Sequence, residues 1–439
     1  MYLRSLHVRN VKLLRDVGID FTGSDGQPRM WTVFVGENRL CKTTLLQTIA
    51  AAACGTDRGT QLVTDVVASW PDLRDPQPIE IDAEFGFSEQ VHPDRIYPGR
   101  NPSPAPPRLW SKLALEPDKR VFAGGSGYIA DQFISKTRPV TDPLTAARSQ
   151  SRPDWFTAGY GPSRLLRSTG MARQTDPPLD RLRSLFGHEL VGIGFIELLE
   201  EDLGRTFTQA LQSVFVESGL LPHVKGLELR GRGGLRSVWD LINAQRFEMD
   251  VAHGKRIHVP ATWLSQGYQT LIAWLADVIG HILLDTRQNL QPEAMEGLVL
   301  IDEIDLHLHP TWQVRLIPAL KRVFPRLQFI ATTHSPMVLP ALTSDEIFLL
   351  SQDDQGSVVV TPSARSPALL TGSELLDTFF AIHALYPSEL GDKASDYRRL
   401  ATDPTRAPAD DDRLLRLRDE LAAAGIVFDW EPVAREADA

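Results

Sequence analysis

The stretch GENRLCKTT, Gly36–Thr44, decides the fold of this chain. It follows the apolar segment WTVFV and runs into TTLLQTIAAAA, whose residues favour a helix with one apolar face. Gly36, Lys42 and Thr43 match the pattern G-x-x-x-x-G-K-[ST], in which backbone amides and a helix N-terminus cradle phosphates. Cys41 stands where the second glycine usually is, so this motif alone leaves open a strand–turn–helix with an unrelated lysine.

Two acidic residues follow a second apolar segment. In GLVLIDEID, Asp302 and Glu303 come directly after a run that is typical of a buried parallel strand, and ligands bind beyond the carboxyl ends of such strands. An aspartate there can hold Mg²⁺ through water, and the adjacent glutamate can polarise an attacking water. The alternative is a pair of solvated acids in a turn, which the phosphate-loop pattern upstream makes less favoured.

Two further motifs carry groups that bind anions. LSQGYQ, Leu264–Gln269, puts Ser265 and Gly267 at the start of an expected helix, where a hydroxyl and amides can face an anion. The alternative there is a simple N-cap serine. FIATTHSP ends another apolar strand with His334, a donor suited to a γ-phosphate. The alternative is a strand-end histidine that caps the next turn.

Composition bounds the class of protein. Of the 439 residues, 42% are hydrophobic and 23% are charged, which suits a soluble globular protein. No run approaches the roughly 18 apolar residues of a membrane span, and the N-terminus lacks the features of a signal peptide, so we expect a cytoplasmic protein with no membrane partner. The two cysteines, Cys41 and Cys54, make a disulfide scaffold or a zinc site implausible. The net charge of −10 gives no global reason to bind nucleic acid.

The order of segments predicts an α/β fold. Alternation in YLRSLHVRNV, IEIDAEFGF and RLWSKLALE predicts strands, and residues from about 56 to 160 form a β-rich region with proline-rich loops. Residues 185–225 favour helices, and short strands follow around LELRGRG, RFEMDV and RIHVPATW. RLQFIATTHSP and DEIFLLSQ predict two more buried strands, and the chain from Ser363 onward is mainly helical.

Taken in this order, the motifs resemble those of the ABC-type ATPases of the SMC, RecF and OLD-like group. The likeness is to the short bacterial AAA-family kind found in defence and DNA-repair loci, such as the PtuA-type ATPases, and it covers residues 1–60 and about 260–352 well. It implies a P-loop NTPase with a mixed β-sheet core, an antiparallel β subdomain, a helical insertion and a small, mainly helical C-terminal tail. The implied parts are an ATPase domain at 1–362, consisting of an N-lobe at 1–60, an insertion at about 61–260 and a signature lobe at about 261–362, and a helical region at 363–439.

The resemblance also implies a site for ATP and Mg²⁺. By motif position, Lys42 binds the β- and γ-phosphates, while Thr43 and Asp302 hold Mg²⁺. Glu303 is the candidate catalytic base, and His334 senses the γ-phosphate. In such ATPases two copies meet head to head, and each ATP lies between the phosphate loop of one copy and the signature helix of the other.

The expected nucleotide-binding residues therefore come from two motifs. Ser265 and Gly267 of the signature would meet the γ-phosphate that the other subunit holds. With the phosphate loop included, the expected set is Gly36, Asn38, Arg39, Cys41, Lys42, Thr43, Thr44, Ser265, Gly267 and Gln269.

The chain departs from the family pattern at several positions. The group has glycine where Arg39 stands, and a positive φ at Cys41 would cost about 1–2 kcal/mol, so we expect ATP to bind and to be hydrolysed slowly. His309 replaces the aspartate that is usual near the end of the D-loop. No Q-loop glutamine is evident, and GYGPSR with Arg164 occupies its place. The HLH stretch, 307–309, is weak evidence for a metal site, and the entry into a helix explains it better.

These features predict an ATP-driven switch. We expect a head-to-head homodimer or higher oligomer that senses or clamps nucleic acid, either DNA or RNA, and controls a separate effector, expected to be a nuclease, in antiviral defence. The defence role is implied by the resemblance alone. The alternatives are a RecF-like DNA repair ATPase and a scaffold that binds ATP without hydrolysing it.

Two observations bear on nucleic acid. The tail after Ser363 shows no acids following strands, as a TOPRIM nuclease would need, so any cutting is expected from another polypeptide. Lys225, Arg230, Arg232 and Arg236 form a basic cluster that could track phosphates, and a solvated hairpin with no specific role is the alternative.

Overall fold

The computed structural model describes residues 1–72, 74–87, 108–129, 144, 155–164, 176–187, 201–221, 223–228, 246–250, 255–286, 288–382, 388–428 and 430–434. The chain divides into two compact units, Met1–Leu370 and Thr371–Ala439. The candidate site lies in the first unit.

A six-stranded sheet forms the centre of the first unit, in the order β14-β13-β3-β12-β11-β7. From β13 to β7 neighbouring strands are parallel, and β14 runs antiparallel to β13. Because parallel strands end at the same edge, the residues that follow β3, β11 and β12 gather there. The six strands are β3 (Trp31–Val35), β7 (Thr157–Tyr160), β11 (Gly297–Ile301), β12 (Leu327–Thr333), β13 (Ile347–Gln352) and β14 (Val358–Pro362).

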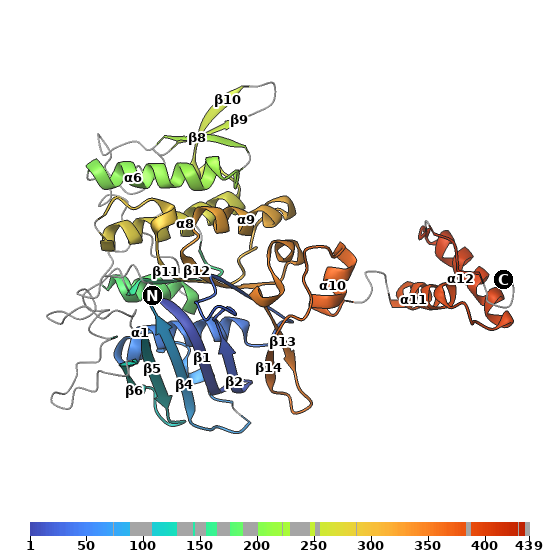
Figure 1. The fold of residues 1–439 in the computed structure, drawn as a ribbon, viewed down its shortest axis with the longest axis horizontal. Coiled ribbons are helices and arrows are strands. Elements are labelled where there is room, and N and C mark those ends of the chain that lie inside the picture. The colour runs from blue at the N-terminus through green and yellow to red at the C-terminus, as the bar shows by residue number, and fades with distance from the viewer. Residues whose placement is uncertain are drawn as a thin grey trace. The chain divides into compact units, whose positions relative to one another are not determined.

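A second, antiparallel sheet has the order β2-β1-β4-β5-β6 (Figure 1). Helix α1 (Lys42–Val63) contacts strands of both sheets and lies between them. It is kinked at Gly55, where φ is 77°. Ser111 of β5 donates a hydrogen bond of 2.7 Å to the carbonyl of Ala52 in this helix. The five strands are β1 (Tyr2–Val11), β2 (Leu14–Asp20), β4 (Ile79–Gly86), β5 (Arg108–Leu115) and β6 (Ala123–Ile129).

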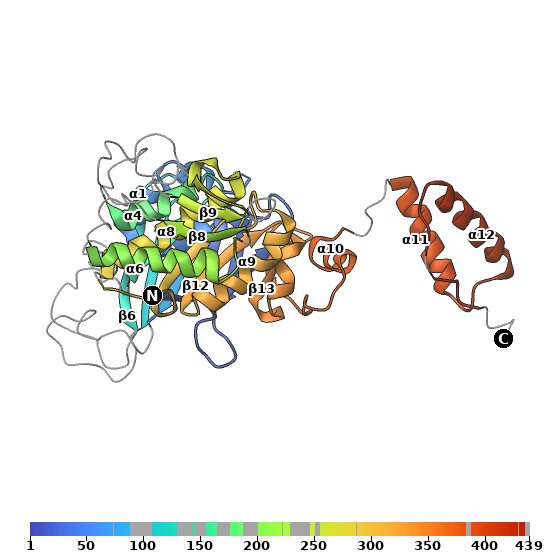
Figure 2. The same cartoon turned by 90° about the horizontal axis from the view of Figure 1, so that it is seen from above.

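Helices cover the other face of the central sheet. Figure 1 shows α8 and α9 between this sheet and α6, with a three-stranded antiparallel sheet, β10-β9-β8, beyond α6. Figure 2 shows the same layers from above. These elements are α6 (Glu201–Gln212), α8 (Gln266–Thr286), α9 (Pro310–Val323), β8 (Val224–Glu228), β9 (Arg246–Asp250) and β10 (Arg256–Pro260). Helix α4 (Pro177–Arg183) packs instead against α1 and β7. A π-helical turn, Ser213–Glu217, extends α6, and short 3₁₀ turns lie at Val67–Ser69, Ser184–Phe186, Ala261–Trp263, Pro292–Ala294, Pro336–Ala341 and Ser344–Glu346.

Helix α8 is apolar and deeply buried. In the described part of the chain it is the one helix long and apolar enough to cross a membrane, with a mean hydropathy of 1.3, and 89% of that window is buried inside the structure. Burial of this kind is typical of the core helix of a globular protein. The prediction that the sequence contains no uninterrupted apolar run of about 18 residues stands, because Asp277 and His281 interrupt this helix.

The described residues of the second unit form three helices, in agreement with the expected mainly helical tail. Tyr397 stacks on Phe428, with ring centroids 4.7 Å apart, and packs near Trp430. This aromatic cluster closes the core between the last two helices. The helices are α10 (Gly372–Phe380), α11 (Ser388–Thr402) and α12 (Pro408–Ala423).

The structure adds strands that the sequence patterns did not predict. Strand β7 has four residues and β6 is rich in glycine, so neither shows the alternation of a longer strand. Strand β14 pairs with the expected β13 as a hairpin. The proline-rich loop 97–107 and Arg230, Arg232 and Arg236 of the basic cluster lie outside the described residues.

Candidate functional site

The predicted phosphate loop connects β3 to α1, as its pattern required. At Gly36 an added Cβ would lie 2.8 Å from the carbonyl oxygen of Leu350 in β13, so only glycine fits there. The Nζ atom of Lys42, at the first position of α1, donates to the carbonyls of Gly36 (2.7 Å) and Glu37 (2.8 Å). Burial lowers the pKa of Lys42, and the charges of Asp302 and Glu303 oppose that shift.

Both departures from glycine in the loop have left-handed backbones. Arg39 has a φ of 74° and Cys41 a φ of 60°. L-residues other than glycine pay for this conformation, so the loop carries strain at two positions. Burial also raises the pKa of the Cys41 thiol, which keeps it protonated at neutral pH.

The acidic pair lies at the end of β11, opposite the start of α1. Asp302 is 3% exposed, and its Oδ2 accepts a hydrogen bond of 2.7 Å from the hydroxyl of Thr43. Its Oδ1 accepts 2.6 Å from the hydroxyl of Thr332, which in turn accepts 2.8 Å from the amide of Glu303. Thr332 therefore orients both acidic residues from the neighbouring strand.

One cavity of about 300 Å³ joins these groups. His334 reaches it from the end of β12, and burial, followed by the charge of Lys42, lowers the pKa of this histidine. The imidazole is therefore neutral at pH 7 and can act as a hydrogen-bond donor or acceptor. The cavity is lined by Lys12, Asn38, Arg39, Leu40, Cys41, Lys42, Thr43, Thr44, Asp302, Glu303 and His334.

Lys12 is a site residue that sequence reasoning missed. It lies in the tight turn between β1 and β2, and its Nζ donates 3.2 Å to the hydroxyl of Thr44. It adds a third cation to a cavity that is also lined by Arg39 and Lys42. No local pattern marks it, because its place beside the loop depends on the packing of the β1–β2 hairpin near α1.

Arg164, which sequence reasoning placed in the position of the Q-loop, does not line the cavity. It is fully buried, and its guanidinium donates to the main-chain carbonyls of Asp302 and Glu303. The residue therefore contacts the acidic pair from behind, through the backbone.

The signature residues lie outside this cavity. Ser265 is exposed immediately before α8. An added Cβ at Gly267 would lie 2.5 Å from the carbonyl oxygen of His307, so the start of α8 approaches the stretch before α9 too closely for any other residue. The side chain of Gln269 donates to the carbonyls of Thr262 and Leu264 and thus holds its own turn.

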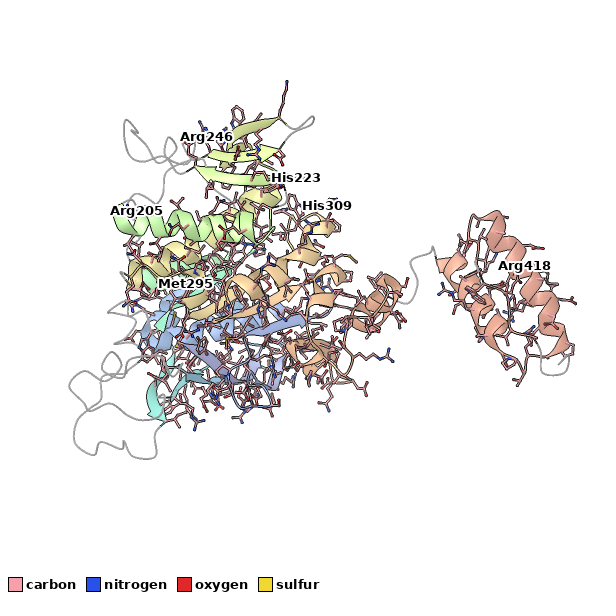
Figure 3. All side chains as sticks on the ribbon, turned by 45° about the horizontal axis from the view of Figure 1, so that its top comes forward. Arg205, His223, Arg246, Met295, His309 and Arg418 are labelled. Atoms are coloured by element: carbon pink, nitrogen blue, oxygen red, sulfur yellow. The ribbon has the colours of Figure 1, made fainter. Side chains whose placement is uncertain are left out.

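His309 belongs to the entry of a helix. Its side chain accepts a hydrogen bond from the amide of Thr311 and caps α9, which begins at Pro310 (Figure 3). Among the described residues, no group of three or more His, Cys, Asp or Glu side chains could hold a metal ion by itself.

The oxygen atoms of Thr43 and Asp302 fit Mg²⁺ when a phosphate completes its shell. Mg²⁺ prefers oxygen ligands and is typically bound by one or two protein oxygens together with substrate phosphates. The hydroxyl of Thr43 and Oδ2 of Asp302 are 2.7 Å apart; Thr43 lies in the first turn of α1, and Asp302 directly follows β11. The lack of a third protein ligand is therefore expected for a magnesium site of this type.

Comparison with known proteins finds relatives of the chain. Residues 32–339 match the family described as AAA domain, putative AbiEii toxin, Type IV TA system. The Septu protein PtuA of Bacillus mycoides (strain KBAB4) is 24% identical over 426 residues, which cover 96% of this chain and 50% of that protein. The Retron Ec83 probable ATPase of Escherichia coli is 42% identical over 110 residues, which cover 25% of this chain and 20% of that protein. The chain thus spans about half or less of the length of these curated relatives.

Among solved structures, the SmcHead bound to the C-winged helix domain of ScpA resembles the chain. The likeness covers 83% of this chain and 98% of that chain, with 16% sequence identity and a TM-score of 0.50. At this identity the likeness concerns the fold alone. The expected class, an SMC head-like P-loop ATPase fold, is confirmed.

Proposed function

The chain belongs to the AAA domain family described as putative AbiEii toxin, Type IV TA system, and we propose that it binds ATP with Mg²⁺ and hydrolyses it slowly. The observation that carries this proposal is the single cavity in which Lys42, Thr43, Asp302, Glu303 and His334 meet. A P-loop ATPase needs a cation for the phosphates, oxygen ligands for the metal and a group that orients water, and this cavity contains all three.

Each residue has a proposed task that its position supports. Lys42 leaves the loop carbonyls and binds the β- and γ-phosphates, and Thr43 and Asp302 hold Mg²⁺. Bound Mg²⁺ would neutralise charge on the phosphates and fix their oxygens. Glu303 orients the attacking water, and the neutral imidazole of His334 donates to the γ-phosphate.

Two features support slow turnover. Lys42 already has two carbonyl partners, which binding must replace. The loop also contains two left-handed residues other than glycine, Arg39 and Cys41. A strained loop of this kind binds phosphate at some cost, although binding at micromolar affinity, about 8 kcal/mol, exceeds that cost.

We propose that the ATP-bound form is a head-to-head homodimer. Ser265 and Gly267 lie outside the cavity that contains Lys42, and exposed Ser265 is available to a second copy. Each signature would then complete the site of the other copy. This arrangement, and the roles of Ser265, Gly267 and Gln269 in it, follow from the family resemblance.

We further propose a cytoplasmic regulator of a separate effector, a nuclease, in antiviral defence. The support is the similarity to a Septu protein and a retron probable ATPase, each of which is longer than the matched segment. The proposed ATPase domain is 1–362, and 363–439 is the proposed helical region.

The test of this regulatory role is to co-purify the chain with the products of adjacent genes and to determine the mass and the nucleic-acid content of the complex. Nuclease activity of that complex supports the proposal, whereas binding of gapped or end-bearing DNA by the chain alone favours the RecF-like alternative.

The test of ATPase activity compares wild type with Glu303→Gln. Calorimetry with Mg²⁺ should detect ATP binding by both proteins, and phosphate release should fall about 100-fold or more in the variant, as expected when a catalytic base is lost. Glu293→Gln, at an exposed position in the same unit, is the matched control and should keep wild-type turnover. If calorimetry detects no nucleotide binding by the wild type, the proposal is wrong. Equal phosphate release by all three proteins favours the non-hydrolysing scaffold.

A further inference from the structure

We infer that Arg164 is a positioning residue for the proposed ATPase: its guanidinium fixes the main-chain turn at Asp302 and Glu303 and so aims the Glu303 carboxylate into the cavity. This inference rests on the proposed function, because it names a residue that supports the same site from behind. Arg164 does not line the cavity, so it acts on the site through the two acidic residues.

The hydrogen bonds of Arg164 are unusual for a buried cation. Buried arginines normally pair with carboxylates. Among the described residues, no carboxylate lies within ion-pair distance of Arg164, and its guanidinium donates to main-chain carbonyls instead. Nη1 donates 2.8 Å to Gly161 and 2.6 Å to Asp302, and Nη2 donates to Glu303. A planar fork of donors thus binds the backbone of the acidic turn.

Arg164 stays charged in this position. Burial lowers its pKa to about 10, and the nearby charges of Asp302, Glu303 and Asp305 oppose the shift. Charged donors make stronger hydrogen bonds to carbonyls than neutral donors do. The residue therefore supplies both direction and positive charge behind the acidic pair.

The turn needs to be held because Glu303 is in an unfavourable conformation. Its φ is 49°, in the left-handed region that glycine tolerates best. The amide of Asp302 donates 2.8 Å to the carbonyl of Tyr160, and the amide of Glu303 donates to Thr332. Arg164 holds the two carbonyls, so both sides of the turn are fixed. The Glu303 carbonyl also accepts 3.0 Å from the amide of Leu306. Without Arg164 this carbonyl keeps that single bond, so the turn is held less firmly and the direction of the Glu303 carboxylate is less well fixed.

The support for Arg164 is itself rigid. An added Cβ at Gly161 would lie 2.2 Å from the carbonyl oxygen of Ser184, and the amide of Gly161 donates 3.2 Å to the Ser184 hydroxyl. The segment after β7 is therefore pressed against the 3₁₀ turn Ser184–Phe186. A site held by such a supporting layer keeps its geometry.

The experiment uses the full chain and two variants, Arg164→Gln and Arg164→Lys. Arg164→Gln should lower kcat about 10- to 100-fold, while Kd for ATP without Mg²⁺ changes less than about threefold, because only the orientation of the acidic pair is lost. Arg164→Lys keeps the charge but cannot bridge two carbonyls as a fork, so it should recover only part of the loss.

Arg181→Gln is the matched control. Arg181 is also buried, but it pairs with Asp285 and lies over the ring of Phe156, at 4.7 Å, away from the cavity. This variant should lower the melting temperature and keep kcat per folded molecule within about threefold of wild type. The comparison separates the positioning of Glu303 from a general loss of stability.

A second readout does not depend on turnover. Amide hydrogen exchange of the peptide that contains residues 297–306 is measured without nucleotide, and Arg164→Gln should accelerate it at least about tenfold relative to Arg181→Gln, since the turn opens locally. If wild type lacks ATPase activity, the proposed function fails and this readout still decides the inference. Unchanged exchange in Arg164→Gln overturns it, as does wild-type kcat. Loss of folding in both Arg164 variants also overturns it, because Arg164 would then serve the fold rather than the turn.

Discussion

The hydroxyl of Thr43 donates a hydrogen bond of 2.7 Å to Oδ2 of Asp302, across 259 positions of the chain. Thr43 lies in the first turn of α1, and Asp302 follows the last residue of β11. Thr43 is therefore carried by a helix, and Asp302 lies in the turn that directly follows a strand. The bond joins the predicted phosphate loop to the predicted acidic pair.

Thr43→Ala should weaken the magnesium-dependent part of ATP binding. We expect Kd for MgATP to rise about tenfold, which corresponds to roughly 1.4 kcal/mol, because one of two protein oxygens for the metal is lost. Kd for ATP in the presence of a chelator should stay within about twofold, since Lys42 remains. Calorimetry measures both values, and Thr64→Ala, at an exposed position at the opposite end of the same helix, is the control. An equal loss with and without Mg²⁺ would place Thr43 on the phosphates instead.

Cys41→Gly should stabilise the protein. The φ of 60° at Cys41 suits glycine, and its thiol lies 4.0 Å from the carbonyl of Arg39 and packs against the edge of the hydrophobic core. We expect the free energy of unfolding in urea to rise by about 0.5–1 kcal/mol, after allowance for the greater freedom of glycine in the unfolded chain. Thr64→Gly, at a φ of −46°, lacks this relief and should be destabilised. A loss of stability in Cys41→Gly would show that the loop is not strained at this residue.

The sequence predicted the parts of this unit that local patterns mark. The strand before Gly36, the helix after Lys42 and the acids after β11 combine an apolar run with residues of special chemistry. Such signals can be recognised in a single sequence, because strand burial requires the apolar run and the loop geometry requires the motif residues. The structure brings Lys42, Asp302 and His334 to one cavity, and their roles stay predictions.

The rest of the site depends on contacts between distant segments. Lys12 reaches the cavity only because β1 and β2 form a hairpin beside α1, and Thr332 acts on Asp302 only because β11 and β12 are neighbours. Strand β7 has four residues and is recognisable only by its pairing with β11. A single sequence contains no pattern for such pairings, so no motif singles these residues out.

Gly267→Ala should disturb the contact between α8 and the stretch before α9. The added Cβ would lie 2.5 Å from the carbonyl oxygen of His307 and 3.4 Å from the ring of Trp312. We expect a loss of about 1–3 kcal/mol in the free energy of unfolding, because a rigid backbone atom must move. Gly125→Ala, where nothing lies within 4 Å of the added Cβ, should change stability by less than about 0.5 kcal/mol. Equal effects in urea denaturation would contradict the close approach at Gly267.

His281 should make the stability of the first unit fall as the pH is lowered. It is fully buried in α8, and burial, followed by the charge of Arg181, lowers its pKa well below the usual 6.5. Oδ1 of Asp277 lies 3.6 Å from Nε2 of His281, but this carboxylate also accepts a hydrogen bond of 2.8 Å from the hydroxyl of Tyr160. The folded protein therefore keeps His281 neutral at a pH where the unfolded chain binds a proton.

The sign of the effect comes from that difference in protons. Below about pH 6.5 the unfolded state holds one more proton at His281, so the free energy of unfolding falls by up to about 1.4 kcal/mol for each pH unit until the lowered pKa is reached. Urea denaturation between pH 7.5 and about pH 5 measures the dependence of the unfolding free energy on pH. His281→Gln should remove the contribution of one proton, about 1.4 kcal/mol per pH unit, from this slope, whatever its effect on absolute stability. His258→Gln, at an exposed position of β10, is the control and should leave the wild-type slope. An unchanged slope in His281→Gln would mean that His281 accepts a proton in the folded state, with Asp277 as its partner.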